Sequence, residues 1–416
     1  MAQHLLPDKL SLLMVASQPR MTSMPTVQCQ LCHTQQWRIF SQISFGVWDK
    51  NTSMLVRKSS DYPLSICQHC GHVQISSEYT SELFKNLYFH SAQEAVMWHE
   101  SLLNSNSPYE EMVSFALSDL APNTIVDFGC GEGKLLEATH SATPKSTLIG
   151  IDFNDRFSQK NIRYLSFDLN QLQNLSNDHW PNGVDLAMAS HVLEHVIDPV
   201  DFLRQIKKQL SPTGAIFIEV PDFSERHNIE SIGMSNLINL QHIHYFTVDS
   251  LNYAAHKAGL KAVKIARITT GYIPRLQMLL KVNLIEQAHV SVSIFNAVDV
   301  ICHYQAQCSE LRSRLASILR EKIIQEGKVG LWGIGADFYS LINEHADLKS
   351  LISQGKMILF DYALKGKEFQ SQIILCSSDI PTVDYTVLIS PLLLETRIKM
   401  RAVCCDWKNV LDCYLK

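Results

Sequence analysis

Short apolar runs alternate with amphipathic, helix-like segments through the middle of the chain. Each run is rich in Ile, Val, Leu or Phe and ends in a polar residue or a turn, which is typical of a buried strand. The runs that predict strands are residues 124–126, 146–151, 162–167, 184–189 and 215–220. Strands that alternate with helices favour a parallel, doubly wound α/β sheet, whose ligands bind at the carboxyl ends of the strands.

The first of these strands leads into a glycine loop. After Asp127, glycines stand at the alternate positions Gly129, Gly131 and Gly133, and a helical pattern begins at Lys134. Glycine lets the backbone approach a ligand closely, and the N–H groups at the helix start face that ligand. The dinucleotide pattern G-x-G-x-x-G needs its third glycine where Lys134 stands. The alternative is a tight turn without a ligand.

An acid follows each of the first three predicted strands: Asp127, Asp152 and Asp168. At the end of the second strand, a carboxylate is placed to accept two hydrogen bonds from a ribose diol, as in nucleotide-binding folds. A single aspartate in such a position is more often a helix cap or part of a turn. Three acids at three successive strand ends favour a shared ligand site.

Two CxxC pairs mark a separate module at residues 28–75. Two such knuckles complete a tetrahedral zinc site, and the alternating patterns at 37–56 and 62–66 predict the short strands of a zinc ribbon. The predicted metal ligands are Cys29, Cys32, Cys67 and Cys70. A closed Cys₄ site has no open coordination position, so we expect a structural role. The alternatives are a redox CxxC pair, or a histidine ligand among His33, His69 and His72.

The remaining patterns divide the chain further. A hairpin at 261–267 and 271–281 ends the core, and a long helical run at 293–326 leads to a second strand, glycine turn and helix. We interpret the latter as a smaller Rossmann-like domain that is either structural or a second ligand site. The expected units are an extension (1–27), the zinc-binding domain (28–75), a helical connector (76–120), the core (121–282), a linker helix (283–326) and a C-terminal α/β domain (327–416).

Composition excludes several function classes. The 416 residues carry a net charge of −5 with no basic block, so we expect no nucleic-acid partner. No apolar run approaches the ~18 residues of a membrane helix, so we expect no membrane partner. The short apolar stretch at 10–15 lacks a clear cleavage site, and we interpret it as an extension rather than a signal peptide, with a targeting role as the alternative. Seven further cysteines without regular spacing favour the reducing cytoplasm.

The order D-x-G-C-G-x-G from Asp127 resembles the first motif of class I S-adenosylmethionine-dependent methyltransferases. The EHV triplet Glu194, His195 and Val196 after the fourth strand is similar to the segment found there in the same family. The resemblance implies that Asp127 lies near the methionine amino group of the donor and that Asp168 lies near its adenine. The donor-binding residues that it implies are Asp127, Gly129, Cys130, Gly131, Asp152, Phe153, Asp168, Leu169, Ser190 and His191.

From about residue 28 to the end, the order of the units is similar to that of bacterial sugar C-methyltransferases. Further motifs support this resemblance: Tyr88 with Ser91 and His99, the strand at 271–281, and Asp361 followed by Lys365, Gly366 and Lys367. The resemblance implies a small-molecule substrate, a nucleotide-linked sugar, methylated on a carbon beside a ketone. It also implies structural Zn²⁺ beside the methyl donor as cofactor.

The same resemblance implies the catalytic residues His242, His195 and Tyr88, with His242 as the base. Two positions depart from the family: Gln241 and Asn239 stand where it typically carries an acid and a tyrosine. Gln241 can orient an imidazole but cannot stabilise its charge. O-methylation is therefore the main alternative chemistry. A binding protein with a degenerate methyltransferase core is the alternative from another class.

Overall fold

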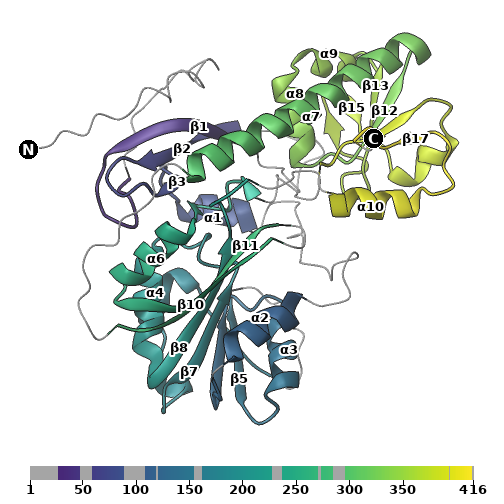
Figure 1. Cartoon of the computed structure of the whole chain (residues 1–416). Helices are drawn as coiled ribbons and strands as arrows, with labels where there is room; N and C mark the ends of the chain where they lie inside the picture. Colours follow the sequence, from purple (N-terminus) through teal and green to yellow (C-terminus); the bar gives the residue numbers. More distant parts are fainter. Residues whose placement is uncertain are drawn as a thin grey trace, which may run out of the picture.

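The computed structural model in Figure 1 describes residues 27–46, 59–88, 108–118, 120–153, 162–226, 237–269, 273–283, 296–392 and 394–414. The predicted extension lies outside these residues apart from Val27. Within this part of the chain, no helix is long and apolar enough to cross a membrane.

A mostly parallel, seven-stranded sheet forms the middle of the chain, in the order β10-β11-β8-β7-β4-β5-β6. Its parallel strands are β4 (Thr124–Phe128), β5 (Thr147–Asp152), β6 (Arg163–Ser166), β7 (Val184–Ser190) and β8 (Leu210–Pro221). The hairpin of β10 (Leu260–Ile268) and β11 (Arg275–Val282) joins antiparallel to β8. The predicted α/β sheet is confirmed, and the fifth strand begins earlier than expected, at Leu210.

Both faces of this sheet are covered, which explains why its strands are continuous apolar runs. Ile125 of β4 packs in one apolar cluster, whereas its neighbours Val126 and Phe128 belong to another. Figure 1 shows helices on both faces. They are α2 (Pro108–Leu117) and α3 (Lys134–Ala142) on one side, and α4 (Pro199–Gln209) and α6 (Val248–Lys257) on the other. Asp198 and Thr247 cap α4 and α6 through their side chains.

The N-terminal sheet is antiparallel and includes a strand from much later in the chain. Its order is β1-β2-β3-β9, with β1 (Trp37–Gly46), β2 (Ser59–Cys67), β3 (Val73–Ile75) and β9 (His244–Tyr245). Val73 pairs with Tyr245 and Gln74 with His244. Helix α1 (Ser81–Tyr88) follows the sheet. The patterns at residues 37–56 and 62–66 did not predict that the segment after residue 239 would complete this sheet.

The long helix α7 (Asn296–Glu326) runs from the N-terminal sheet to a second parallel sheet (Figure 1). Its Gln305 accepts a hydrogen bond from Ser41 of β1 at 2.8 Å, and further along it Arg312 pairs with Glu344. The second sheet has the order β13-β12-β16-β17, from β12 (Val329–Trp332), β13 (Met357–Phe360), β16 (Val387–Ile389) and β17 (Val410–Leu411). Its helices are α8 (Ala336–Glu344), α9 (Asp347–Ser353) and α10 (Leu394–Val403).

Smaller elements complete the described structure. The two-stranded ribbon of β14 (Glu368–Phe369) and β15 (Gln372–Ile373) lies beside the second sheet. The short 3₁₀ helices are Leu169–Asn174, Asn177–His179 and Ser377–Thr382.

The packing of α7 can be tested by truncating one buried and one exposed aliphatic side chain. Leu319 is fully buried in the cluster that joins α7 to the second sheet, whereas Ile324 is 85% exposed. Because a cavity remains where a buried side chain is removed, Leu319→Ala should lower the free energy of unfolding by about 2–5 kcal/mol. Ile324→Ala should change it by no more than about 0.5 kcal/mol. Urea unfolding followed by circular dichroism measures both, and equal effects would contradict this packing.

Candidate active site

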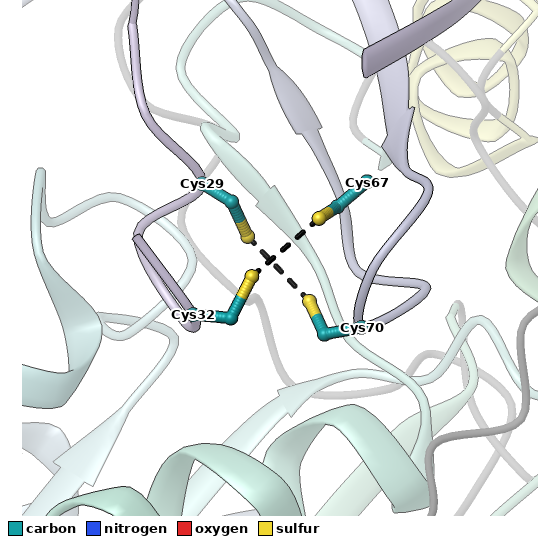
Figure 2. Close-up of side chains that lie close together, drawn as sticks. All are labelled: Cys29, Cys32, Cys67 and Cys70. Carbon is teal, nitrogen blue, oxygen red and sulfur yellow. Dashed lines mark hydrogen bonds between the residues drawn. The ribbon is translucent and has the colours of Figure 1, made fainter. Parts of the chain in front are cut away.

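The four cysteines of the CxxC pairs converge on one point, as Figure 2 shows. Sulfur–sulfur distances are 3.6 Å between Cys29 and Cys70 and 3.5 Å between Cys32 and Cys67. Four thiolates around one Zn²⁺, each bound at about 2.3 Å, would lie about 3.8 Å apart. All four cysteines are free of disulfides. The donor set and its spacing therefore fit a tetrahedral zinc ion.

None of the candidate histidines among the described residues joins this cluster. His33 and His69 are exposed, while buried His72 contacts His244 of β9, with 3.0 Å between Nε2 and Nδ1. His244 Nε2 lies 3.1 Å from the carbonyl oxygen of Val196, to which it donates. Burial lowers the pKa of His244 to about 4, so it is neutral. His244 is thus a packed, hydrogen-bonded histidine that joins the N-terminal sheet to the segment after β7.

The glycine loop wraps the carboxyl end of β4. Gly129, Gly131 and Gly133 all have positive φ, and Gly133 is the residue before α3. The amide of Gly131 donates to Oδ2 of Asp152 at 2.9 Å, which holds the loop against the end of β5. The three glycines are therefore needed for backbone conformation.

Asp127 and Asp152 face each other across adjacent strands. Asp127 is buried, and its Oδ1 has no hydrogen-bond partner in the part of the chain that the structure describes. Burial and the nearby charge of Asp152 raise the pKa of Asp127 to about 8. Such a carboxyl group gains most from a cationic ligand, because the ligand would offset both effects.

Asp168 lies just beyond β6 and is exposed to solvent. Its carboxylate accepts a hydrogen bond from the amide of Asn170 at 3.0 Å and caps the short helix that follows. This is the capping arrangement expected of a lone aspartate at a strand end. Leu169 is half-buried beside it, Phe153 is 40% exposed, and burial raises the pKa of the Cys130 thiol.

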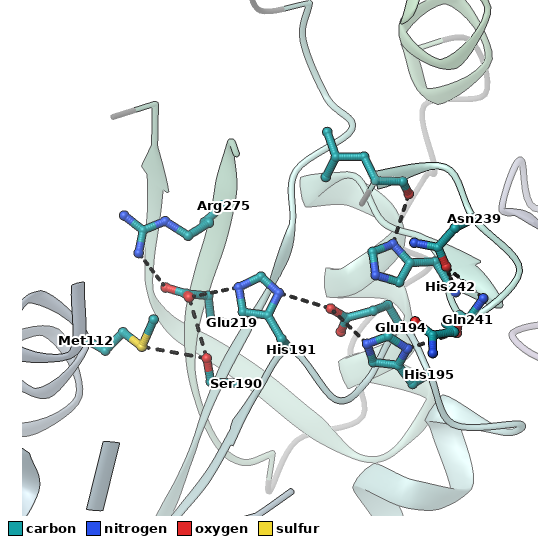
Figure 3. A network of polar contacts seen from close by, with 11 residues as sticks. Met112, Ser190, His191, Glu194, His195, Glu219, Asn239, Gln241, His242 and Arg275 are labelled. Atoms are coloured by element: carbon teal, nitrogen blue, oxygen red, sulfur yellow. Dashed lines mark hydrogen bonds and ion pairs between the residues drawn. The ribbon is translucent and has the colours of Figure 1, made fainter. Parts of the chain in front are cut away.

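His191 is clamped between two buried carboxylates (Figure 3). Its Nδ1 lies 3.1 Å from Glu194 and its Nε2 lies 3.3 Å from Glu219. Burial alone would lower its pKa, but the hydrogen bonds and charges of the two acids outweigh burial and raise the pKa to about 9. His191 is therefore a charged, structural centre of the site.

Glu219 belongs to a second polar group on the neighbouring strands. It accepts a hydrogen bond from Gln277 at 2.6 Å and one from Ser190 at 3.5 Å, and a guanidinium nitrogen of Arg275 lies 3.8 Å away. Our sequence analysis did not include Glu219 in the site. Its signal was a single acid within the apolar strand AIFIEV, which requires a partner when buried.

Glu194, His195 and His242 form a compact cluster on the other side of His191 (Figure 3). The ligating atoms of the three side chains all lie within 4.8 Å of one another, and the two imidazole rings meet edge to face at 4.8 Å between centroids. His195 Nδ1 lies 2.8 Å from the carbonyl oxygen of Gln241, and His242 Nδ1 lies 2.9 Å from that of Leu237. Our sequence analysis assigned no role to Glu194.

The protonation states follow from burial and from these contacts. Burial and the neighbouring His195 lower the pKa of His242 to about 3, so His242 is neutral. Burial raises the pKa of Glu194, but the hydrogen bond from His191 and the nearby histidines lower it to about 2. A carboxylate and a neutral imidazole therefore stand side by side at neutral pH.

Gln241 and Asn239 fix the conformation of the backbone around His242 rather than the orientation of its imidazole. The Asn239 side-chain oxygen accepts the amides of Gln241 at 2.7 Å and His242 at 3.2 Å, which forms a local turn. The Gln241 side chain donates to the carbonyl oxygen of Leu87 at 3.1 Å. The expectation that the side chain of Gln241 orients an imidazole needs correction, since its backbone carbonyl, not its amide, contacts His195.

Helix α1 thus ends next to this cluster. Tyr88 is its last residue, but the Tyr88 side chain lies outside the described residues, as do Ser91 and His99 entirely. Their predicted roles stay predictions.

Comparison with known proteins places a known domain in the middle of the chain. The family described as "Methyltransferase domain" matches residues 97–265. This match supports a methyltransferase domain in that part of the chain. The chain is also 28% identical over 112 residues to the ubiquinone biosynthesis O-methyltransferase of Dictyostelium discoideum, covering 23% of this chain and 34% of that protein. It is 29% identical over 107 residues to the trans-aconitate 2-methyltransferase of Rhodopseudomonas palustris, covering 25% and 40%. The chain therefore spans between a third and two fifths of the length of these relatives.

Solved structures match about two fifths of the chain. An O-methyltransferase from Nostoc punctiforme, whose function is given as unproven, matches 41% of this chain and 55% of its own at 14% identity and a TM-score of 0.34. A Burkholderia thailandensis 1,6-didemethyltoxoflavin-N1-methyltransferase with bound S-adenosylhomocysteine matches 42% and 77%, at 16% identity and a TM-score of 0.33.

The glycine loop offers a direct test of its backbone geometry. At Gly129, φ is +87° and an added Cβ would lie 2.3 Å from a methyl carbon of Val192. Gly129→Ala should therefore lower the free energy of unfolding by about 2–4 kcal/mol, from positive φ and overpacking together. Gly335 is the matched control, because nothing lies within 4 Å of an added Cβ there. Thermal unfolding should show Gly335→Ala close to the unsubstituted protein, and similar melting temperatures for both variants would contradict the geometry.

Proposed function

We propose that this chain transfers a methyl group from S-adenosylmethionine to a nucleotide-linked sugar, on a carbon beside a ketone. The observation that carries the proposal is the pair of buried acids, Asp127 and Asp152, on either side of the glycine loop. The match of residues 97–265 to a methyltransferase domain supports the same donor.

On the donor side, each residue has a proposed task. Asp127 pairs with the cationic amino group of the methionine moiety, and Asp152 holds the ribose diol while it anchors Gly131. Phe153 and Leu169 offer apolar surface to the adenine, with Asp168 beside them. Ser190 and His191 act by holding the carboxyl ends of β7 and β8 in place, since both contact Glu219.

On the acceptor side, His195 and His242 form the proton-accepting centre, with Tyr88 as a further contact from α1. Each imidazole donates through Nδ1 to a backbone carbonyl, so its lone pair lies on Nε2. Removal of the proton beside the ketone gives an enolate, whose carbon attacks the sulfonium methyl and releases S-adenosylhomocysteine. Because no acid precedes His242, O-methylation of a sugar hydroxyl is the second candidate, and the name of the Dictyostelium relative favours it.

The cysteine cluster holds a structural Zn²⁺ in this proposal. The ion would fix the turns that carry Cys67 and Cys70, directly before His72 and β3. Strand β3 pairs with β9, which adjoins His242 in the chain. The zinc ion would therefore keep the acceptor side in register with the methyltransferase core.

The state of Asp127 predicts how donor binding depends on pH. Below about pH 8 the free protein holds Asp127 mostly protonated, whereas a cationic ligand favours the carboxylate. Binding therefore releases a proton, and affinity should rise with pH by up to about tenfold per unit between pH 6 and 7.5. Isothermal titration with S-adenosylmethionine measures this slope, which Asp127→Asn should flatten. A slope of zero in the unsubstituted protein would remove Asp127 from this role.

The acceptor side is tested by turnover. With nucleotide-linked keto-sugars as acceptors, His195→Ala and His242→Ala should each lower kcat by about 10²–10⁴, because proton removal loses its acceptor. His256→Ala, half-buried in the last turn of α6 and outside the polar cluster, is the control and should leave kcat unchanged. Nuclear magnetic resonance of the product separates a new C–CH₃ from an O–CH₃ group. If the protein binds no S-adenosylmethionine at all, the enzyme proposal fails and a binding role takes its place.

A further inference from the structure

We propose that Glu194, His195 and His242 form a second metal site, one that binds a divalent transition-metal ion such as Zn²⁺ or Co²⁺. These side chains come from two segments, the turn after β7 and the stretch before β9, yet their ligating atoms lie within 4.8 Å of one another. Nε2 of His195 lies 3.8 Å from Oε1 of Glu194. Ligand atoms around a tetrahedral ion at about 2.0–2.1 Å lie about 3.4 Å apart, so this pair would approach by about 0.4 Å and the most distant pair by at most about 1.4 Å.

Both imidazoles carry their protons on the side away from the cluster. The carbonyl oxygens of Gln241 and Leu237 can only accept hydrogen bonds, so Nδ1 of His195 and Nδ1 of His242 must donate to them. This places each Nε2 lone pair toward the cluster. Metal-binding histidines characteristically donate their other ring N–H to a carbonyl or carboxylate in this way, which fixes the ring and its tautomer.

The carboxylate of Glu194 is held in the same manner. Its Oε1 receives the Nδ1 proton of His191 at 3.1 Å, while its Oε2 is buried and has no hydrogen-bond partner among the described residues. Glu194 is fully buried, so an oxygen without a partner costs free energy unless something binds it. A cation among the three side chains would satisfy that oxygen.

The donor atoms select the kind of ion. Two imidazole nitrogens and one carboxylate oxygen suit Zn²⁺, Fe²⁺ or Co²⁺ better than Mg²⁺ or Ca²⁺, which prefer oxygen ligands alone. Three protein ligands leave a coordination position open, unlike the closed cluster of four cysteines in Figure 2. The two sites therefore differ in both ligand type and accessibility.

The role of this ion in catalysis rests on the proposed function. The ketone or hydroxyl oxygen of the acceptor would occupy the open position, where the ion would polarise it and ease transfer of the neighbouring proton to a water molecule from solvent, since the lone pairs of both imidazoles would be bound to the ion. His195 and His242 would then act as ligands, and their replacement would lower turnover in either case. Turnover alone therefore does not test the metal site, but metal binding does so without donor or acceptor.

The experiment titrates Co²⁺ into the full chain after dialysis against a chelator, with the zinc retained by the cysteines counted first by elemental analysis. We expect one further Co²⁺ per chain, with visible absorption bands of a nitrogen and oxygen environment and no thiolate charge-transfer band near 300–350 nm. His195→Ala should weaken this binding more than about 100-fold, since losing only a hydrogen-bond partner behind a ligand already costs about 10–100-fold. Glu194→Gln should do the same, whereas His256→Ala should bind as the unsubstituted protein does.

Two results would overturn the site. One is cobalt uptake that shows only thiolate bands, which needs no variant and so does not depend on how the variants fold. The other is equal affinity in the unsubstituted protein and in folded His195→Ala, with folding checked by circular dichroism. If either result is found and the protein still transfers methyl groups, the metal site fails while the proposed function stands. If the protein binds a second ion but no S-adenosylmethionine, the metal site stands while the proposed function fails.

Discussion

The buried carboxylate of Glu194 is the constraint on which this architecture most depends. Its side chain holds His191 and lies beside His195, and its backbone carbonyl accepts the amides of Ile243 at 2.8 Å and His244 at 3.1 Å. A single residue in the turn after β7 thereby fixes both the contacts around His191 and the chain that follows His242. A charge buried this completely persists only because it is paired and hydrogen-bonded, so any change here affects both halves of the site.

The N-terminal module and the methyltransferase domain are joined by shared secondary structure and are not merely consecutive along the chain. Strand β9 completes the N-terminal sheet, and the buried pair of His72 and His244 connects that sheet to the carbonyl of Val196. The order of the chain suggested a separate ribbon followed by a core. The physical unit is instead a continuous hydrogen-bonded path from the cysteines to the turn that carries Glu194 and His195.

Several features could be predicted because they depend on short stretches of chain. The alternation of strands and helices, the positive φ of the glycine loop and the spacing of the CxxC pairs are each local. Asp168 shows the limit of such reasoning. Its position at a strand end is right for a ligand contact, yet the carboxylate caps the following helix, and the sequence pattern is the same for both.

By itself, the sequence determined which chemical groups follow one another along the chain: two cysteine pairs, then the glycine loop with its acids, then the histidines. Tertiary structure decided which of them act together. Glu194 lies within one cluster with His195 and His242. The side chain of Gln241 donates a hydrogen bond to the carbonyl oxygen of Leu87, and Glu219 of β8 accepts one from Gln277 of β11. These contacts join residues far apart in sequence, and burial sets the charge of each group. No local pattern encodes either effect, because both arise only when distant segments pack and exclude water.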